Sequence, residues 1–176
     1  MIIEHLSLRN QIEPLLKAEV QKWQEKKLTL IVDTRESDPL FASTKNLSIV
    51  RKKLDVGDYS IAGLENLITV ERKKQNDFEN CLTNHRERFE KELLRGKNYI
   101  CKAILIEGIS FNDLLIDSIN DVKFRVVLNS IISFMARGWN FFFAVDRVMA
   151  KYFVLYFLRK SYNAIRRARV VNCQVL

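Results

Sequence analysis

The segment from Gly57 to Asp77 restricts the possible folds of this chain most. It contains two short apolar runs on either side of a turn, and the second run ends in charged residues. Residues 59–62 and 67–72 are expected to form the two strands of a hairpin. Side chains two apart on a strand share a face, so Glu71 and Lys73 should project together. The segment therefore predicts a strand whose end carries a carboxylate and an ammonium side by side.

Asp58 precedes the first strand of this hairpin, so two carboxylates and one ammonium come from a single short stretch. Carboxylate oxygens bind Mg²⁺, and a lysine can orient or activate the water that attacks a phosphodiester. Taken singly, each residue is more simply read as a turn residue or a solvated strand end. The surrounding sequence decides between these readings.

That surrounding sequence carries a family resemblance. The chain reads G-D-Y at 57–59, V-E-R-K at 70–73 and D-F at 77–78, while D-T-R-E at 33–36 follows an apolar run and Arg86 lies nine residues beyond Asp77. In this order the elements resemble the G-D-x(n)-E-R-K-x-x-x-D signature of the XPF-type structure-specific endonucleases. The D-x-R-E and the arginine also have counterparts in that family.

The resemblance implies a Mg²⁺-dependent site, in which Mn²⁺ can substitute. Its metal ligands would be Asp58 and Glu71, helped by the Arg72 backbone carbonyl. Asp33 and Glu36 would complete a second, weaker metal position or hold ordered waters. Lys73 would stabilise or help deprotonate the attacking water. The implied catalytic residues are Asp58, Glu71, Lys73, Asp33, Arg72 and Glu36, and the implied DNA-binding residues are Arg35, Arg86 and Lys74.

Asp77 belongs to the family signature, but this position also suits a helix N-cap, as does Asn76. The mechanism needs no lone histidine, so His85 is left outside the predicted site.

The periodicity predicts an α/β fold with strands alternating with helices in the second half. The resemblance narrows this to a restriction-endonuclease-like core, a mixed central sheet flanked by helices, with an N-terminal helical extension. Strands are expected at 28–33, 47–54, 59–62, 67–72, 101–107 and 139–145, and helices at 12–23, 77–93, 122–135 and 148–158.

We expect an N-terminal helical extension at 1–27, in which Pro14 falls in a first turn, a nuclease domain at 28–165 and a basic C-terminal tail at 166–176. Many XPF-type nucleases add a helix-hairpin-helix domain with glycines at its tight turns. This chain has five glycines and none in a G-x-G after Gly96, so no such domain is expected.

The final predicted helix, at 148–158, is apolar almost all round, which is typical of a helix covered on more than one side. One side can pack on the sheet, and a second subunit is the simplest cover for the other. Family relatives pair through this region. We therefore expect a homodimer or heterodimer built on this helix.

Composition fits a globular chain with a polyanionic partner: the net charge is +8, with 48% hydrophobic residues. Three cysteines without metal-ligand spacing indicate a reducing compartment. No secretory signal begins the chain, and the longest apolar run, 152–158, is far shorter than a membrane span of about 20 residues. We expect an intracellular protein without a membrane anchor, cytoplasmic in a prokaryote or virus and nuclear in a eukaryote.

The sequence thus predicts a Mg²⁺- or Mn²⁺-dependent DNA endonuclease, acting at branched or junction DNA in repair or recombination. One alternative is a non-catalytic DNA-binding or scaffolding subunit of a nuclease dimer. Another is a nuclease for RNA or small nucleotides, which is disfavoured because no aromatic RNA-stacking motif is present.

Overall fold

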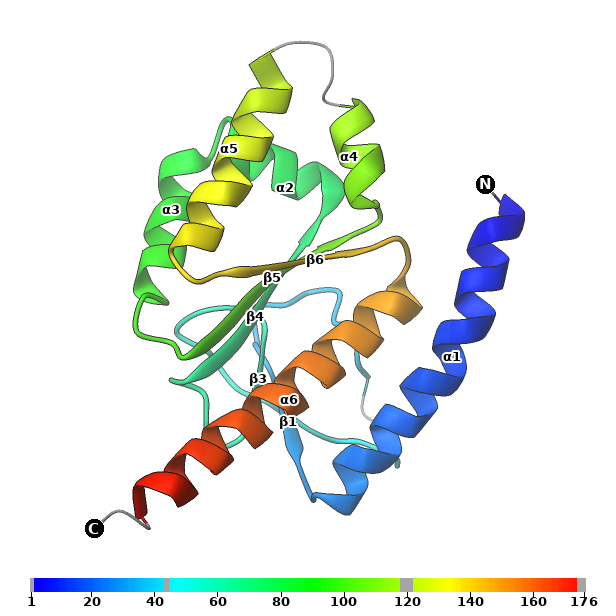
Figure 1. The fold of residues 1–176 in the computed structure, drawn as a ribbon, viewed down its shortest axis with the longest axis vertical. Helices are drawn as coiled ribbons and strands as arrows, with labels where there is room; N and C mark the ends of the chain where they lie inside the picture. Colours follow the sequence, from blue (N-terminus) through cyan, green and yellow to red (C-terminus); the bar gives the residue numbers. More distant parts are fainter. Residues whose placement is uncertain (1, 43–44, 118–121, 174–176) are drawn as a thin grey trace.

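The computed structural model describes residues 2–42, 45–117 and 122–173 (Figure 1). Its helices are α1 (Ile2–Glu25), α2 (Gln75–Leu82), α3 (Arg86–Arg95), α4 (Phe111–Asp117), α5 (Val122–Ala136) and α6 (Arg147–Cys173). Its strands are β1 (Thr29–Val32), β2 (Ser48–Arg51), β3 (Tyr59–Ile61), β4 (Ile68–Lys74), β5 (Cys101–Glu107) and β6 (Asn140–Ala144).

The strands form one mixed sheet in the order β2-β1-β3-β4-β5-β6. β1 runs parallel to β2, and β4, β5 and β6 run parallel to one another. β3 lies between the two parallel groups and is antiparallel to both β1 and β4. The carboxyl ends of β1, β4, β5 and β6 therefore meet at one edge of the sheet, together with the start of β3.

Helices cover both faces of this sheet. One core joins α1, α6 and the sheet through residues such as Trp23, Val70 and Leu155. The other core joins α2, α3, α5 and the opposite face through residues such as Phe78 and Ile104. The predicted fold class is confirmed: a mixed sheet flanked by helices, with an N-terminal helix.

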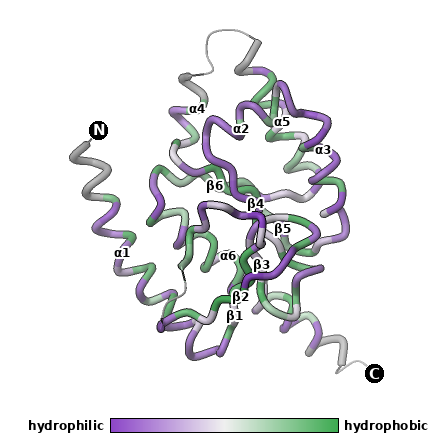
Figure 2. Tube along the Cα trace, turned by 180° about the vertical axis from the view of Figure 1, so that it is seen from behind, coloured by the Kyte–Doolittle hydropathy of each residue, from purple (hydrophilic) through white to green (hydrophobic). Residues whose placement is uncertain are grey.

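The N-terminal helix packs along α6 (Figure 1). Trp23 is fully buried and donates its indole N–H to the Leu155 carbonyl oxygen at 3.1 Å. Glu19 and Arg159 form a buried two-point ion pair across the same contact. Hydrophobic and hydrophilic residues alternate along α1 (Figure 2), as expected of a helix with one face against the core.

This contact changes the argument for a dimer. The apolar content of α6 requires a cover away from the sheet, and α1 of the same chain supplies one. A second subunit is therefore not needed to bury that face, and dimerisation stays a prediction. Tyr156 remains 37% exposed on α6.

Several predicted boundaries were wrong. The single helix expected at 77–93 is two helices, because Thr83 leaves the helical conformation and its hydroxyl bonds the Glu79 carbonyl oxygen. Pro14 lies inside α1 instead of in a first turn, since that helix already begins at Ile2. α4 was not predicted. The expected basic tail is helical as far as Cys173, and its last residues, 174–176, lie outside the described residues.

None of the helices in the described ranges is both long and apolar enough to cross a membrane.

Candidate active site

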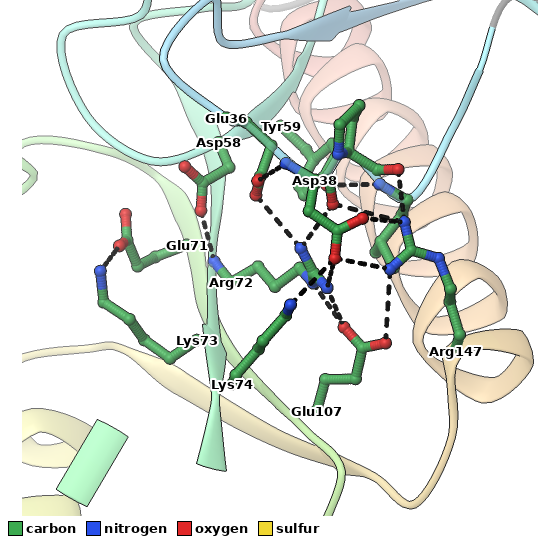
Figure 3. Close-up of polar contacts among 12 residues, drawn as sticks. Glu36, Asp38, Asp58, Tyr59, Glu71, Arg72, Lys73, Lys74, Glu107 and Arg147 are labelled. Atoms are coloured by element: carbon green, nitrogen blue, oxygen red, sulfur yellow. Dashed lines mark hydrogen bonds and ion pairs between the residues drawn. The ribbon is translucent and has the colours of Figure 1, made fainter. Parts of the chain in front are cut away.

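Gly57, whose backbone has a left-handed conformation, sets the position of Asp58 at the sheet edge. Gly57 has φ +77°, and a Cβ there would lie 2.1 Å from the Thr69 hydroxyl oxygen, so only glycine fits. The chain then pairs with β4: the Asp58 N–H donates to the Val70 carbonyl at 2.9 Å. In return the Arg72 N–H donates to Asp58 Oδ2 at 2.7 Å, which fixes the carboxylate beside Glu71 (Figure 3).

Glu71 and Lys73 share a face of β4, as the strand period predicts, and their side chains form an ion pair (Figure 3). The Glu71 side chain is only 3% exposed, and burial raises its pKa despite the neighbouring Lys73 charge. Burial alone lowers the pKa of Lys73, but the charge of Glu71 and their hydrogen bond outweigh it and raise that pKa. Lys73 also lies 5.6 Å from the Phe89 ring centroid.

Asp33, at the end of β1, is held by protein donors on both oxygens. Arg35 donates from its backbone N–H at 2.7 Å and from its guanidinium at 2.8 and 3.0 Å, and the Leu54 N–H donates at 2.6 Å. Burial on its own raises the pKa of Asp33, but these hydrogen bonds together lower it. In this arrangement Asp33 positions Arg35, and metal binding by Asp33 would require displacement of one of these donors.

The Arg72 side chain points to the opposite side of β4 from Glu71 and is buried among acids (Figure 3). It donates to Glu107 Oε2 at 2.5 Å, to Glu36 Oε2 at 3.3 Å and to the Asp38 carbonyl oxygen at 2.8 Å. Two segments far apart in sequence, the loop after β1 and the end of β5, are therefore joined to the end of β4 through one guanidinium.

Sequence reasoning missed three members of this network. Asp38 accepts from Arg147 at 3.0 and 3.1 Å and from Lys74 at 3.0 Å, and these two cations lower its pKa. Glu107 ends β5 and joins Arg72 to Arg147. Their positions in the sequence could have identified them. Glu107 ends one predicted strand and Arg147 follows another, and the carboxyl ends of both strands meet at this edge. Lys74, predicted to bind DNA, is paired with Asp38 in this structure.

A cleft of about 380 Å³ opens between the loop after β1 and helices α2 and α3. Lys73 lines its floor, with Glu36 on one wall and Asp77, Arg88 and Glu92 on the other. Asp77 lies in the first turn of α2 and is exposed, and the N-cap is Lys74, so the predicted capping role was wrong.

Arg86, predicted to bind DNA, lies outside this cleft. It donates to the Ser130 hydroxyl at 2.9 Å and pairs with Glu90 at 3.1 Å. Arg88, which is not among the predicted DNA-binding residues, lines the cleft instead. Both arginines lie off the apolar stripe of α3, so periodicity alone cannot choose between them.

The donor set fits a hard divalent cation such as Mg²⁺. Burial and the nearby Glu71 charge raise the pKa of Asp58 well above its usual range, because they disfavour its ionised form, and a bound cation would favour that form. Asp58 Oδ1 accepts no hydrogen bond from the described residues, which leaves it available as a ligand. No group of three or more His, Cys, Asp or Glu able to hold an ion was found among those residues, but Mg²⁺ commonly takes only one or two carboxylates.

The mixed six-stranded sheet flanked by helices, with an N-terminal helix, matches the XPF nuclease fold. The ERCC4 domain family matches residues 32–167, and the chain belongs to this family. The predicted resemblance to XPF-type nucleases is thereby confirmed. Membership implies a structure-specific DNA nuclease or a DNA-binding domain. No curated protein matches the chain.

Two solved structures share the fold. XPF from Aeropyrum pernix is 19% identical with a TM-score of 0.58, over 84% of this chain and 71% of that one. XPF from Aeropyrum pernix in complex with DNA is 20% identical with a TM-score of 0.56, over 77% of this chain and 66% of that one.

Proposed function

We propose that this protein is a metal-dependent DNA endonuclease that hydrolyses phosphodiester bonds at branched or junction DNA, in repair or recombination. The observation that carries the proposal is the convergence of Asp58, Glu71 and Lys73 at the sheet edge, beside an open cleft. Family membership and the net charge of +8 support a DNA substrate.

Asp58 and Glu71 would hold Mg²⁺ or Mn²⁺, with the Arg72 backbone carbonyl as a further oxygen donor. When bound, such an ion polarises a phosphoryl oxygen and lowers the pKa of a coordinated water. Mg²⁺ keeps several waters and accepts few protein ligands, which suits a two-carboxylate site. Asp33 and Glu36 are less suited to a second metal position, because Arg35 and Arg72 already occupy their oxygens.

The remaining residues position the reacting groups. Lys73 lines the cleft and can orient the attacking water or stabilise the phosphate charge. Arg35, whose side chain is 56% exposed, is aimed by Asp33 and can donate to a phosphate oxygen. The Arg72 guanidinium holds the loop that carries Glu36 and Asp38 against the sheet edge.

Cleavage of a labelled forked DNA with Mg²⁺ or Mn²⁺ tests the proposal. Asp58→Ala and Glu71→Ala, and EDTA added to the wild type, should each abolish cleavage, while Asp55→Ala serves as a matched control at an exposed aspartate in the same loop. Flapped, duplex, single-stranded and RNA substrates define the preference. Unchanged turnover in either site variant would overturn the assignment.

The alternative, a non-catalytic DNA-binding or scaffolding subunit, gives a different result in the same assay. DNA binding without cleavage in either metal would favour it. The retained acids and lysine of the signature argue against it, since a subunit without catalysis has no need to bury two like charges together.

A further inference from the structure

Helix α3 presents a basic face that the proposed chemistry does not use. Arg88, Lys91 and Arg95 recur at intervals of three and four residues, which places them on one side of a helix. They line a groove of about 790 Å³, together with His85, Arg86 and a single acid, Glu87. The groove is therefore concave and carries an excess of positive charge.

Most of these charges are not committed to partners within the protein. Arg88 and Lys91 make no ion pair or side-chain hydrogen bond with the described residues, and both are exposed. Arg95 approaches Glu92 only to 4.0 Å, and its side chain is 54% exposed. Arg86 differs, because Ser130 and Glu90 hold it. Three cations are thus free to meet an anion from solution.

The groove is continuous with the candidate active-site cleft. His85 and Arg88 line both, and Lys73 lies on the floor of the cleft beyond them. A polyanion with one phosphate at Lys73 would therefore leave the cleft past Arg88 and follow α3 toward Arg95.

We propose that the groove along α3 binds successive backbone phosphates of the DNA strand as it leaves the active site, an inference that rests on the proposed nuclease function. Arg88 and Arg95 are seven residues apart, about 10 Å along a helix axis. One DNA strand carries its phosphates at regular intervals, so a row of cations of this length can contact neighbouring phosphates of the same strand. Backbone contacts of this kind position DNA without reading its sequence.

The test measures binding of a short labelled duplex in EDTA, where no cleavage occurs, over a series of salt concentrations. Lys91→Gln with Arg95→Gln removes two groove charges without touching the cleft. The control is Lys22→Gln with Lys26→Gln, which removes two exposed charges near the end of α1, on the far side of the molecule from α3 (Figure 1).

The groove variant should bind about tenfold more weakly near physiological salt, and its plot of log affinity against log salt should be shallower by about two, one for each lost phosphate contact. The control should keep the wild-type slope. Equal losses in the two variants would show a net-charge effect and overturn the proposal. Tighter binding of a matched RNA duplex through the same groove would overturn the assignment to DNA.

Cleavage assays separate this proposal from the proposed function. If the wild type binds DNA but never cleaves it, and the groove variant shows the predicted slope change, the groove assignment stands and the nuclease assignment fails. If the wild type cleaves and the groove variant binds with an unchanged slope, the groove assignment fails alone. Circular dichroism of both variants confirms that the fold is intact.

Discussion

Replacement of Asp58 by asparagine should separate the role of this residue in cleavage from its effect on stability. The new side-chain amide keeps an oxygen that can accept the Arg72 N–H, 2.7 Å away in the native protein. That hydrogen bond is worth about 1 kcal/mol, so the local backbone should hold its shape. The negative charge next to Glu71 is lost.

The sign of the stability change follows from the Asp58 pKa. Burial and the Glu71 charge raise this pKa above its unfolded value, so the contribution of Asp58 to stability is greatest at low pH and is lost as pH rises through the folded pKa. Asp58→Asn cannot ionise and avoids the loss. At about pH 8 we expect it to gain about 1–2 kcal/mol and about 4 °C in Tm.

Thermal unfolding in EDTA, followed by circular dichroism over a pH series, measures this effect. The advantage of Asp58→Asn should shrink as pH falls, since native Asp58 then becomes protonated. Asp55→Asn, at an exposed aspartate, should show no comparable gain. Mg²⁺ should raise the Tm of the wild type but not of Asp58→Asn, and the variant should not cleave DNA. A variant less stable than the wild type at about pH 8, or a gain independent of pH, would refute the reasoning.

Three further predictions concern the turn before Asp58, the contact between α1 and α6, and the oligomeric state. Gly57→Ala should destabilise the protein by about 2–3 kcal/mol in urea unfolding, because φ +77° and the Thr69 contact both exclude a Cβ, whereas Gly63→Ala, with open space around its Cβ, should cost less. Glu19→Ala should cost about 3 kcal/mol by leaving Arg159 buried and unpaired, and adding Arg159→Met should restore much of the loss; no recovery would contradict this account. Light scattering at micromolar concentration should show a dimer, and a monodisperse monomer would instead indicate that α1 is the complete cover of α6.

The sequence predicted best those parts of the fold whose side-chain pattern repeats over a few residues and depends only on residues close by in the chain. β4 begins with a short apolar segment and β5 contains one, and the Glu71–Lys73 pair follows from the alternation of a strand. The order of strands in the sheet depends on contacts far apart in the chain. Local pattern therefore did not reveal that Glu107 and Arg147 would lie beside Arg72.

What periodicity did not predict depends on contacts that a local pattern does not register. The pairing of α1 with α6, through Trp23 and Glu19, joins positions more than a hundred residues apart, so the sequence pattern did not reveal that α1 covers part of α6. The break at Thr83 depends on a hydroxyl that competes for a backbone carbonyl, which a periodicity count does not register. The residue at which α3 begins after that break determines whether Arg86 or Arg88 faces the cleft.

The polar network around Arg72 has a consequence for synthesis of the chain. It joins Glu36 and Asp38, near the N-terminus, to Glu107 and finally to Arg147 at the start of α6. A nascent chain extended at about 5–20 residues per second exposes the G-D and E-R-K residues several seconds before Arg147 is added. The loop that walls the cleft can lock against the sheet edge only after β5, β6 and the first turn of α6 have emerged. An incomplete chain thus lacks the finished cleft, and under the proposed function it could not cleave DNA until its fold is nearly complete.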